Sequence, residues 1–111
     1  MTSIDRRTLV MRYLRTEAGF PFAIRCHADE IGYPEGVQGL RLPAPFQGAW
    51  ISAARGITMA QREWIVDETA PGFRIFVVRN RKKRSLDEDI VVMSSRAFAE
   101  LTRNYYEGGS R

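Results

Sequence analysis

The stretch AWISAARGITMAQREWIVDETAPGFRIFVV, residues Ala49–Val78, predicts the central unit of the fold. Its first part, Trp50–Ala54, is a short apolar run of the kind found in buried strands. Its last part, Phe73–Val78, is almost wholly apolar and β-branched or aromatic, as in a strand that is covered on both faces. The segment between them has the signals of a helix. The stretch therefore predicts a strand, a helix and a second strand.

The helix of this unit has a start signal and a stop signal. Thr58 and Gln61 have the spacing of a capping box, in which each side chain binds the backbone N–H of the other residue. Pro71-Gly72 is a helix-ending pair, so we expect the helix to reach that point. Trp64 lies within the helix and Trp50 on the first strand, where tryptophan is more often a packing residue than a base-stacking one. We expect Gln61 and Trp64 to give structural support.

The part of the chain before this unit predicts one helix and two strands. Ile4–Ala18 has an apolar stripe, with arginines on the rest of its surface, as in an amphipathic helix. Phe22–Cys26 alternates and reads as a strand whose first, third and fifth residues point inward. Ala28–Gln47 carries most of the prolines and is expected to be a long irregular section, with a brief strand at Gly36–Leu40.

The part after the unit predicts a polar connection, a strand and a helix. Asn80–Asp89 is the connection and Ile90–Met93 is the short strand. The helix, capped by Ser94 or Ser95, has an apolar stripe that consists of Phe98, Leu101 and Tyr105.

The C-terminal end of that helix carries two adjacent tyrosines, Tyr105 and Tyr106. We expect this pair to close the helix onto the core, with a contact between copies of the chain as the alternative. Residues 107–111 are expected to form a loose tail.

The predicted order is α-β-β-β-α-β-β-α, an α/β sandwich with a mixed central sheet flanked by helices. With 111 residues, of which 44% are apolar and 27% charged, the chain is expected to form a single domain over residues 1–111. No apolar run approaches the ~20 residues that span a bilayer. The chain also begins without a signal segment, so we expect a cytoplasmic protein with no membrane association.

Two side chains that often do chemistry have structural interpretations here. Cys26 is the single cysteine, which excludes an internal disulfide and favours a buried structural thiol. His27 is the single histidine, and the sequence does not reveal an acid that would pair with it, so a surface position is favoured over a catalytic base. Neither a phosphate-cradling glycine motif nor a nucleophile elbow occurs.

The net charge of +4 and the fifteen arginines are consistent with a nucleic-acid partner. A run at the end of the predicted Phe73–Val78 strand has five cations in six positions: Arg79, Arg81, Lys82, Lys83 and Arg84. One interpretation is contact with phosphates, which Arg binds in a bidentate manner. The other is a solvated turn whose cations pair with the three acids at positions 87–89. Both remain open.

Several segments together resemble the PD-(D/E)XK nuclease superfamily, in particular its Holliday junction resolvase-like and VRR-nuclease-like members. The segments are an N-terminal helix followed by GFPFAIR, a glycine-containing turn before AWISAAR, TMAQREW at the start of a helix, and RIFVVRNR before a basic loop. The Q-x-x-W pattern and the VVR strand of such proteins correspond to Gln61, Trp64, Val77, Val78 and Arg79. The resemblance implies a restriction-endonuclease-like core.

The resemblance also implies where a nuclease site would lie. Such proteins place one acid before the second strand and an acid and a lysine two residues apart on the next strand, where carboxylates hold Mg²⁺. Here Glu35 is the candidate for the first acid, but the pair falls on Ser52 and Ala54, which cannot do this work. We therefore expect a degenerate active site, with Glu35 and Ser52 as its vestiges and no confident metal ligand.

Rescue of that site would need another carboxylate, from Glu17, Asp29 or Glu30. The function expected from charge and resemblance is binding of duplex or branched DNA, with weak or lost cleavage. The binding residues would be Arg55 and the run Arg79–Arg84, with helix arginines assisting, in a protein that can form a homodimer. Alternatives are an active Mg²⁺-dependent endonuclease and a phage or mobile-element module that binds a host protein through Ala28–Gln47.

Overall fold

The computed structural model describes residues 5–33, 38–52, 56–80 and 86–108. Its elements, in order, are α1 (Arg6–Thr16), β1 (Ile24–His27), η1 (Ala28–Ile31), β2 (Gln38–Arg41), β3 (Phe46–Ser52), α2 (Met59–Ile65), β4 (Phe73–Val78), η2 (Leu86–Glu88), β5 (Ile90–Val92) and α3 (Ser95–Gly108). Here η marks a short 3₁₀ helix. The order of α-helices and strands is the predicted one. Among the described residues, no helix has both the length and the apolar character to cross a membrane.

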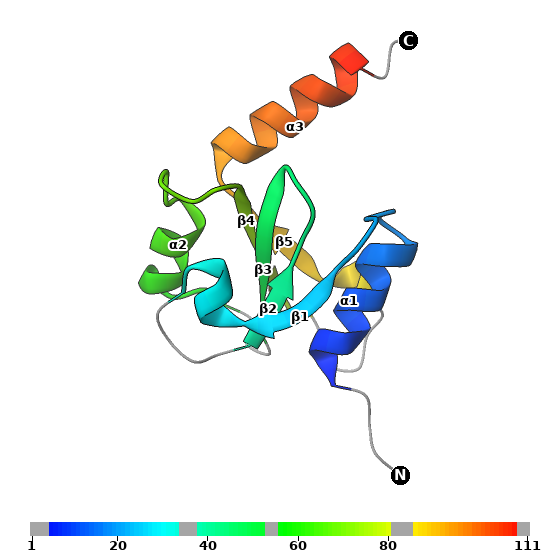
Figure 1. Cartoon of the computed structure of the whole chain (residues 1–111), viewed down its shortest axis with the longest axis vertical. Helices are drawn as coiled ribbons and strands as arrows, with labels where there is room; N and C mark the ends of the chain where they lie inside the picture. Colours follow the sequence, from blue (N-terminus) through cyan, green and yellow to red (C-terminus); the bar gives the residue numbers. More distant parts are fainter. Residues whose placement is uncertain (1–4, 34–37, 53–55, 81–85, 109–111) are drawn as a thin grey trace.

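The five strands form one mixed sheet in the order β1-β2-β3-β4-β5. β3 and β4 are parallel, and the other neighbouring pairs are antiparallel. In Figure 1 the sheet stands between α1 on one side and α2 on the other. The protein is thus a compact α/β domain with a mixed sheet between helices, as the sequence predicts.

β4 is the strand that the sequence predicts best, because its bounds are those expected and its residues pack on both faces. Phe76 and Val78 belong to the apolar cluster beneath α2, together with Trp50 and Trp64. The alternate residues, Ile75 and Val77, join the cluster beneath α1, with Val10, Leu14, Leu40 and Ala49. Both tryptophans are buried, so their interpretation as packing residues is confirmed.

α2 starts as predicted but ends early. Thr58 is its N-cap and forms the capping box with Gln61. The expected end at Pro71-Gly72 is wrong, because the helix stops at Ile65. Beyond it, the carboxylate of Asp67 accepts hydrogen bonds from both the N–H and the hydroxyl of Thr69, which fixes a turn in place of another helical turn. These bonds hold the pKa of Asp67 below its usual value.

Replacing Thr58 with alanine is expected to destabilise the protein by about 1 kcal/mol, because one cap hydrogen bond of α2 is lost. Urea unfolding followed by circular dichroism measures this change. Thr16→Ala is the matched control, since that hydroxyl is exposed and binds a carbonyl of its own helix. Equal effects from the two substitutions would contradict the role of the cap.

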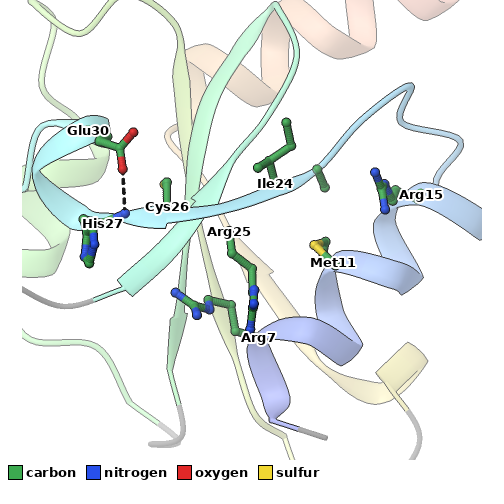
Figure 2. Close-up of a pocket in the computed structure, with 9 residues that line it drawn as sticks. Arg7, Met11, Arg15, Ile24, Arg25, Cys26, His27 and Glu30 are labelled. Atoms are coloured by element: carbon green, nitrogen blue, oxygen red, sulfur yellow. Dashed lines mark hydrogen bonds between the residues drawn. The ribbon is translucent and has the colours of Figure 1, made fainter.

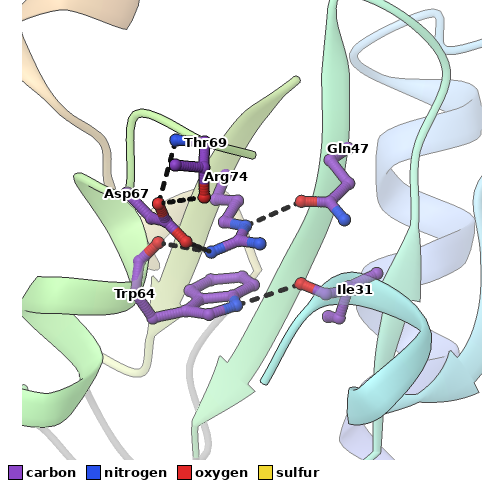
Figure 3. Close-up of polar contacts among 6 residues, drawn as sticks. All are labelled: Ile31, Gln47, Trp64, Asp67, Thr69 and Arg74. Carbon is purple, nitrogen blue, oxygen red and sulfur yellow. Dashed lines mark hydrogen bonds and ion pairs between the residues drawn. The ribbon is translucent and has the colours of Figure 1, made fainter. Parts of the chain in front are cut away.

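Arg74 joins α2 to the sheet and was not identified from the sequence as a buried residue. Only 5% of Arg74 is exposed. Its Nε donates to Oε1 of Gln47 at 2.7 Å, and its Nη1 donates to the carbonyl of Trp64 at 3.0 Å and to Asp67 at 3.3 Å. Figure 3 shows these contacts around the guanidinium, which lies 5.0 Å from the centre of the Trp64 ring. Burial lowers the pKa of Arg74 from its ordinary value.

Gly32 makes room for Arg74. Its φ of +81° lies in the left-handed region, and a Cβ at this position would collide with Nη2 of Arg74. The same turn brings the carbonyl of Ile31 to the Trp64 ring nitrogen, which donates to it at 3.0 Å.

Two predictions for the section before β3 need correction. More than half of the described residues of Ala28–Gln47 belong to η1, β2 and the start of β3, so the section is less irregular than expected, and the brief strand expected at Gly36–Leu40 corresponds to β2 at Gln38–Arg41. β1 starts at Ile24 rather than at Phe22, and Ile24 is 51% exposed because β1 is an edge strand. The residue that the alternation had placed outward, Ala23, is fully buried.

α3 does not pack as expected. Ser94 caps it by accepting a hydrogen bond from the N–H of Ala97, and the helix continues to Gly108, so it includes the first two residues of the expected tail. The prediction that Tyr105 and Tyr106 close the helix onto the core is wrong, because they are 72% and 71% exposed. In Figure 1 α3 projects from one end of the domain, away from the sheet.

Candidate nucleic-acid interface

At one end of the sheet, described strands begin or end next in the chain to the segments that the sequence singled out. In the register of the sheet Ser52 pairs with Val78, and His27 pairs with Gln38. The last residues of β1, β3 and β4 and the first residues of β2 and β5 therefore lie at the same end of the sheet. We call this the Ser52 end of the sheet. In the chain, residues 34–37 precede β2, residues 53–55 follow β3, and residues 81–85 come between β4 and η2. Glu35, Arg55, Arg81, Lys82, Lys83 and Arg84 belong to these segments and lie outside the described residues.

Arg6 occupies the described part of the Ser52 end. Its Nε donates to the backbone carbonyl of Ser52 at 3.0 Å, and its Nη1 pairs with Asp89 at 2.7 Å. Both side chains of this ion pair are largely buried, with exposures of 14% and 9%. Nη2 of Arg6 is also buried and has no hydrogen-bond partner within the part of the chain that the structure describes. Asp89 therefore pairs with a helix arginine.

The sequence carried a signal for this role of Arg6. Arg6 precedes Val10 and Leu14 by steps of four residues, which places it on the buried stripe of α1. Its neighbour Arg7 lies about 100° further around the helix and faces outward toward β1. The sequence pattern placed all arginines of α1 on the solvent-exposed surface, so the buried position of Arg6 was not predicted.

Of the three carboxylates proposed for rescue, Asp29 lies in η1, and neither Glu30 nor Glu17 is available at Ser52. Glu30 is occupied, because one oxygen accepts the N–H of His27 and the other accepts from Arg41, each at 2.9 Å. Glu17 lies at the opposite end of α1 from Arg6, about 16 Å away at 1.5 Å per residue. Within residues 5–33, 38–52, 56–80 and 86–108, no group of three or more His, Cys, Asp or Glu could hold a metal ion. Ser52 itself is 8% exposed, and the described residues around it do not fit a Mg²⁺ site.

A shallow groove begins beside the Ser52 end and runs between α1 and β1. Arg7, Met11 and Arg15 line it from α1, and Arg25 and His27 line it from β1. Its volume is about 470 Å³. Figure 2 shows Arg25 extending from β1 toward Arg7, whereas Ile24 and Cys26 point to the other side of the strand. We call this the α1–β1 groove.

The α1–β1 groove is positively charged. Arg7, Arg15 and Arg25 line it, and Arg25 pairs with Asp5 at 3.6 Å through side chains that are half exposed. The one acid in the lining, Glu30, is paired with Arg41. Because exposed ion pairs are weak and exchange with solvent, the arginines of the groove are available to an anionic partner. The sequence did not single out Arg25, since nothing local shows that β1 lies against α1.

Cys26 is buried and unlinked, as predicted. Burial, and secondarily the charge of Glu30, raises the pKa of its thiol, which disfavours the thiolate that a nucleophile requires. His27 is exposed, also as predicted, and Arg79 is half-buried where β4 ends. Neither the cysteine nor the histidine has the neighbours of a catalytic residue.

Comparisons with protein-family models, with curated proteins and with solved structures found no match.

Proposed function

We propose that this protein binds duplex or branched DNA through the α1–β1 groove and the Ser52 end of the sheet. The observation that carries the proposal is the alignment of Arg7, Arg15 and Arg25 along one open groove. Arg7 and Arg15 are eight residues apart on α1, which corresponds to about 12 Å along the helix axis. That length exceeds the spacing of one nucleotide along a DNA strand, so the two arginines can contact different phosphates. A phosphate backbone laid along α1 would therefore meet both arginines.

The proposal includes the basic run Arg79–Arg84 and Arg55 because of their order in the chain. The run follows β4 directly, and the N-terminus of α1 lies at the same end of the sheet through the contact between Arg6 and Ser52. Arg55 follows β3, the parallel neighbour of β4.

The second part of the proposal is that this protein has a PD-(D/E)XK-like fold and has lost nuclease activity. Its support is the predicted order of elements and a mixed sheet flanked by α1 and α2. The position of Arg6 gives a physical reason for the loss of cleavage. The positive charge next to Ser52 is a guanidinium paired with Asp89, and a guanidinium neither binds water as a metal does nor serves as a base.

The test is fluorescence anisotropy of a labelled four-way junction and a labelled duplex over a series of salt concentrations. Arg7→Gln/Arg15→Gln/Arg25→Gln is expected to weaken binding about 10- to 100-fold at moderate salt. It should also reduce the slope of log affinity against log salt by about 2–3, because each lost phosphate contact removes about 0.9 from the slope. The matched control is Arg62→Gln/Arg96→Gln/Arg103→Gln, which removes the same charge from exposed positions on α2 and α3.

A second variant tests the basic run, with serine at Arg79, Arg81, Lys82, Lys83 and Arg84, and it is also expected to bind more weakly. Equal losses in the groove variant and its control would reduce the effect to net charge and count against the groove. Absence of any DNA binding at low salt would refute the proposal and favour a protein-interaction module. Cleavage of the junction in Mg²⁺ that Glu35→Ala abolishes would refute the loss of cleavage.

A further inference from the structure

α3 is an amphipathic helix whose apolar face is left uncovered. Among its described residues, only Ala97 is buried, while Phe98, Tyr105 and Tyr106 are 63%, 72% and 71% exposed. No other helix or strand in the described part of the chain has three exposed large apolar side chains. In Figure 1 the helix projects from the domain, with neither α1 nor α2 beside it. Apolar surface this concentrated marks an interaction site.

The apolar face of α3 is symmetric about the middle of the helix. Phe98, Leu101 and Tyr105 form one stripe at three- and four-residue spacing, and Leu101 lies near the centre of the Ser95–Gly108 helix. In an antiparallel pair of such helices related by a two-fold axis near Leu101, Phe98 of each copy faces Tyr105 of the other. Edge-to-face contacts between aromatic rings then form twice, which is the self-complementarity that a two-fold interface requires.

The charges of α3 distinguish a protein partner from a membrane or a nucleic acid. Arg96, Glu100, Arg103 and Glu107 share the opposite face, so the helix has no net charge. A helix that lies on a membrane carries Lys and Arg around its apolar face, and a helix that binds nucleic acid has an excess of positive charge. α3 has neither. In the antiparallel pair all four charged residues of each copy stay in solvent, so no like charges are brought together.

The available area fits a weak dimer. With about 200 Å² for each aromatic side chain, the exposed fractions of Phe98 and Tyr105 amount to roughly 270 Å² in each copy, and Tyr106, about 100° further around the helix, lies at the edge of the contact. Two copies therefore bury roughly 550–800 Å², which is the range of a weak interface rather than of a tight one. Tyr105 and Tyr106 already pack edge to face, with ring centres 5.2 Å apart, so their ordering costs little on association.

From these observations we infer that α3 binds the α3 helix of a second copy of this chain, in antiparallel orientation, to form a two-fold dimer. The inference is independent of DNA binding, because it is carried by other residues. β5 leads into α3 and runs antiparallel to β4, so α3 starts from the end of the sheet opposite Ser52. The dimer therefore leaves both α1–β1 grooves uncovered.

Light scattering coupled to size exclusion, at about 100 µM protein, is expected to give twice the 12.7 kDa mass of the chain. Phe98→Glu/Tyr105→Glu places two carboxylates in the interface and is expected to give the monomer mass, with a loss of dimer affinity of at least tenfold. Arg96→Glu/Arg103→Glu places the same two carboxylates on the charged face and should remain dimeric. Near-ultraviolet circular dichroism of the buried tryptophans reports whether each variant keeps the folded core.

A cross-linking experiment tests the orientation. Under mild oxidation an equimolar mixture of Phe98→Cys and Tyr105→Cys chains is expected to form a disulfide between the two variants, whereas a parallel pair would link each variant to itself. Arg103→Cys on the charged face should not form a linked dimer, and Cys26 of the unmodified chain is buried. A monomeric wild-type protein at this concentration would overturn the inference. So would a dimer that persists in Phe98→Glu/Tyr105→Glu, or a monomer that binds anionic lipid vesicles through Phe98 and Tyr105.

Discussion

Arg74→Ala is expected to lower the free energy of unfolding by about 3–4 kcal/mol. The guanidinium of Arg74 binds Gln47, the carbonyl of Trp64 and Asp67, and stacks over the Trp64 ring. Removing it leaves a buried carbonyl and a partly buried amide oxygen without a donor, each of which costs about 1–3 kcal/mol. The ion pair with Asp67 adds less, because 39% of the Asp67 side chain is exposed and the charge is screened by solvent.

Two further variants isolate the cause of this loss. Arg74→Met restores most of the lost packing but leaves both acceptors unpaired, so its destabilisation is expected to be intermediate. Arg62→Ala, on the exposed surface of α2, should change the free energy of unfolding by less than about 0.5 kcal/mol. Urea unfolding followed by circular dichroism gives all three values. If Arg74→Met were as stable as the wild type, the polar contacts of Arg74 would contribute no net stability.

Phe76→Ala is expected to cost about 3–5 kcal/mol, the range for removing a fully buried aromatic ring. Phe76 is 0% exposed and stacks on Trp50, with ring centres 6.0 Å apart. A domain of this size has roughly 5–15 kcal/mol of stability in total, so the variant should be close to unfolding at room temperature. Differential scanning calorimetry is expected to show a melting temperature lower by about 10–25 °C.

Ile90→Ala provides the control for Phe76. Ile90 lies on the neighbouring strand but is 51% exposed, so truncating it should lower the melting temperature by no more than a few degrees. A comparable loss in both variants would mean that Phe76 is no more deeply packed than the half-exposed Ile90 on the edge strand β5.

The two proposed surfaces lie at opposite ends of the sheet. A dimer formed through α3 would carry two DNA-binding grooves, and each would act independently of the helix contact. For this reason Phe98→Glu/Tyr105→Glu should keep the intrinsic affinity of a single groove for a short duplex. It should lose only the additional affinity that a branched junction has when its arms bind both grooves of the dimer.

The sequence by itself determined the order of the elements, the bounds of β4 and the start of α2. These depend on local features, namely the apolar run of Phe73–Val78 and the capping box of Thr58 and Gln61. Such features act within a few residues, so they have the same effect wherever the segment lies in the fold.

Only the tertiary structure decided where α2 ends, what holds Arg74, and which arginines line a common groove. Arg7 and Arg25 are 18 positions apart in the chain, and they meet because α1 packs against the side of the sheet on which β1 is the edge strand. The same holds for α3, whose stripe predicts an apolar contact but not its partner. A helical period specifies which residues share a face, whereas the element that covers that face is set by the packing of the whole chain.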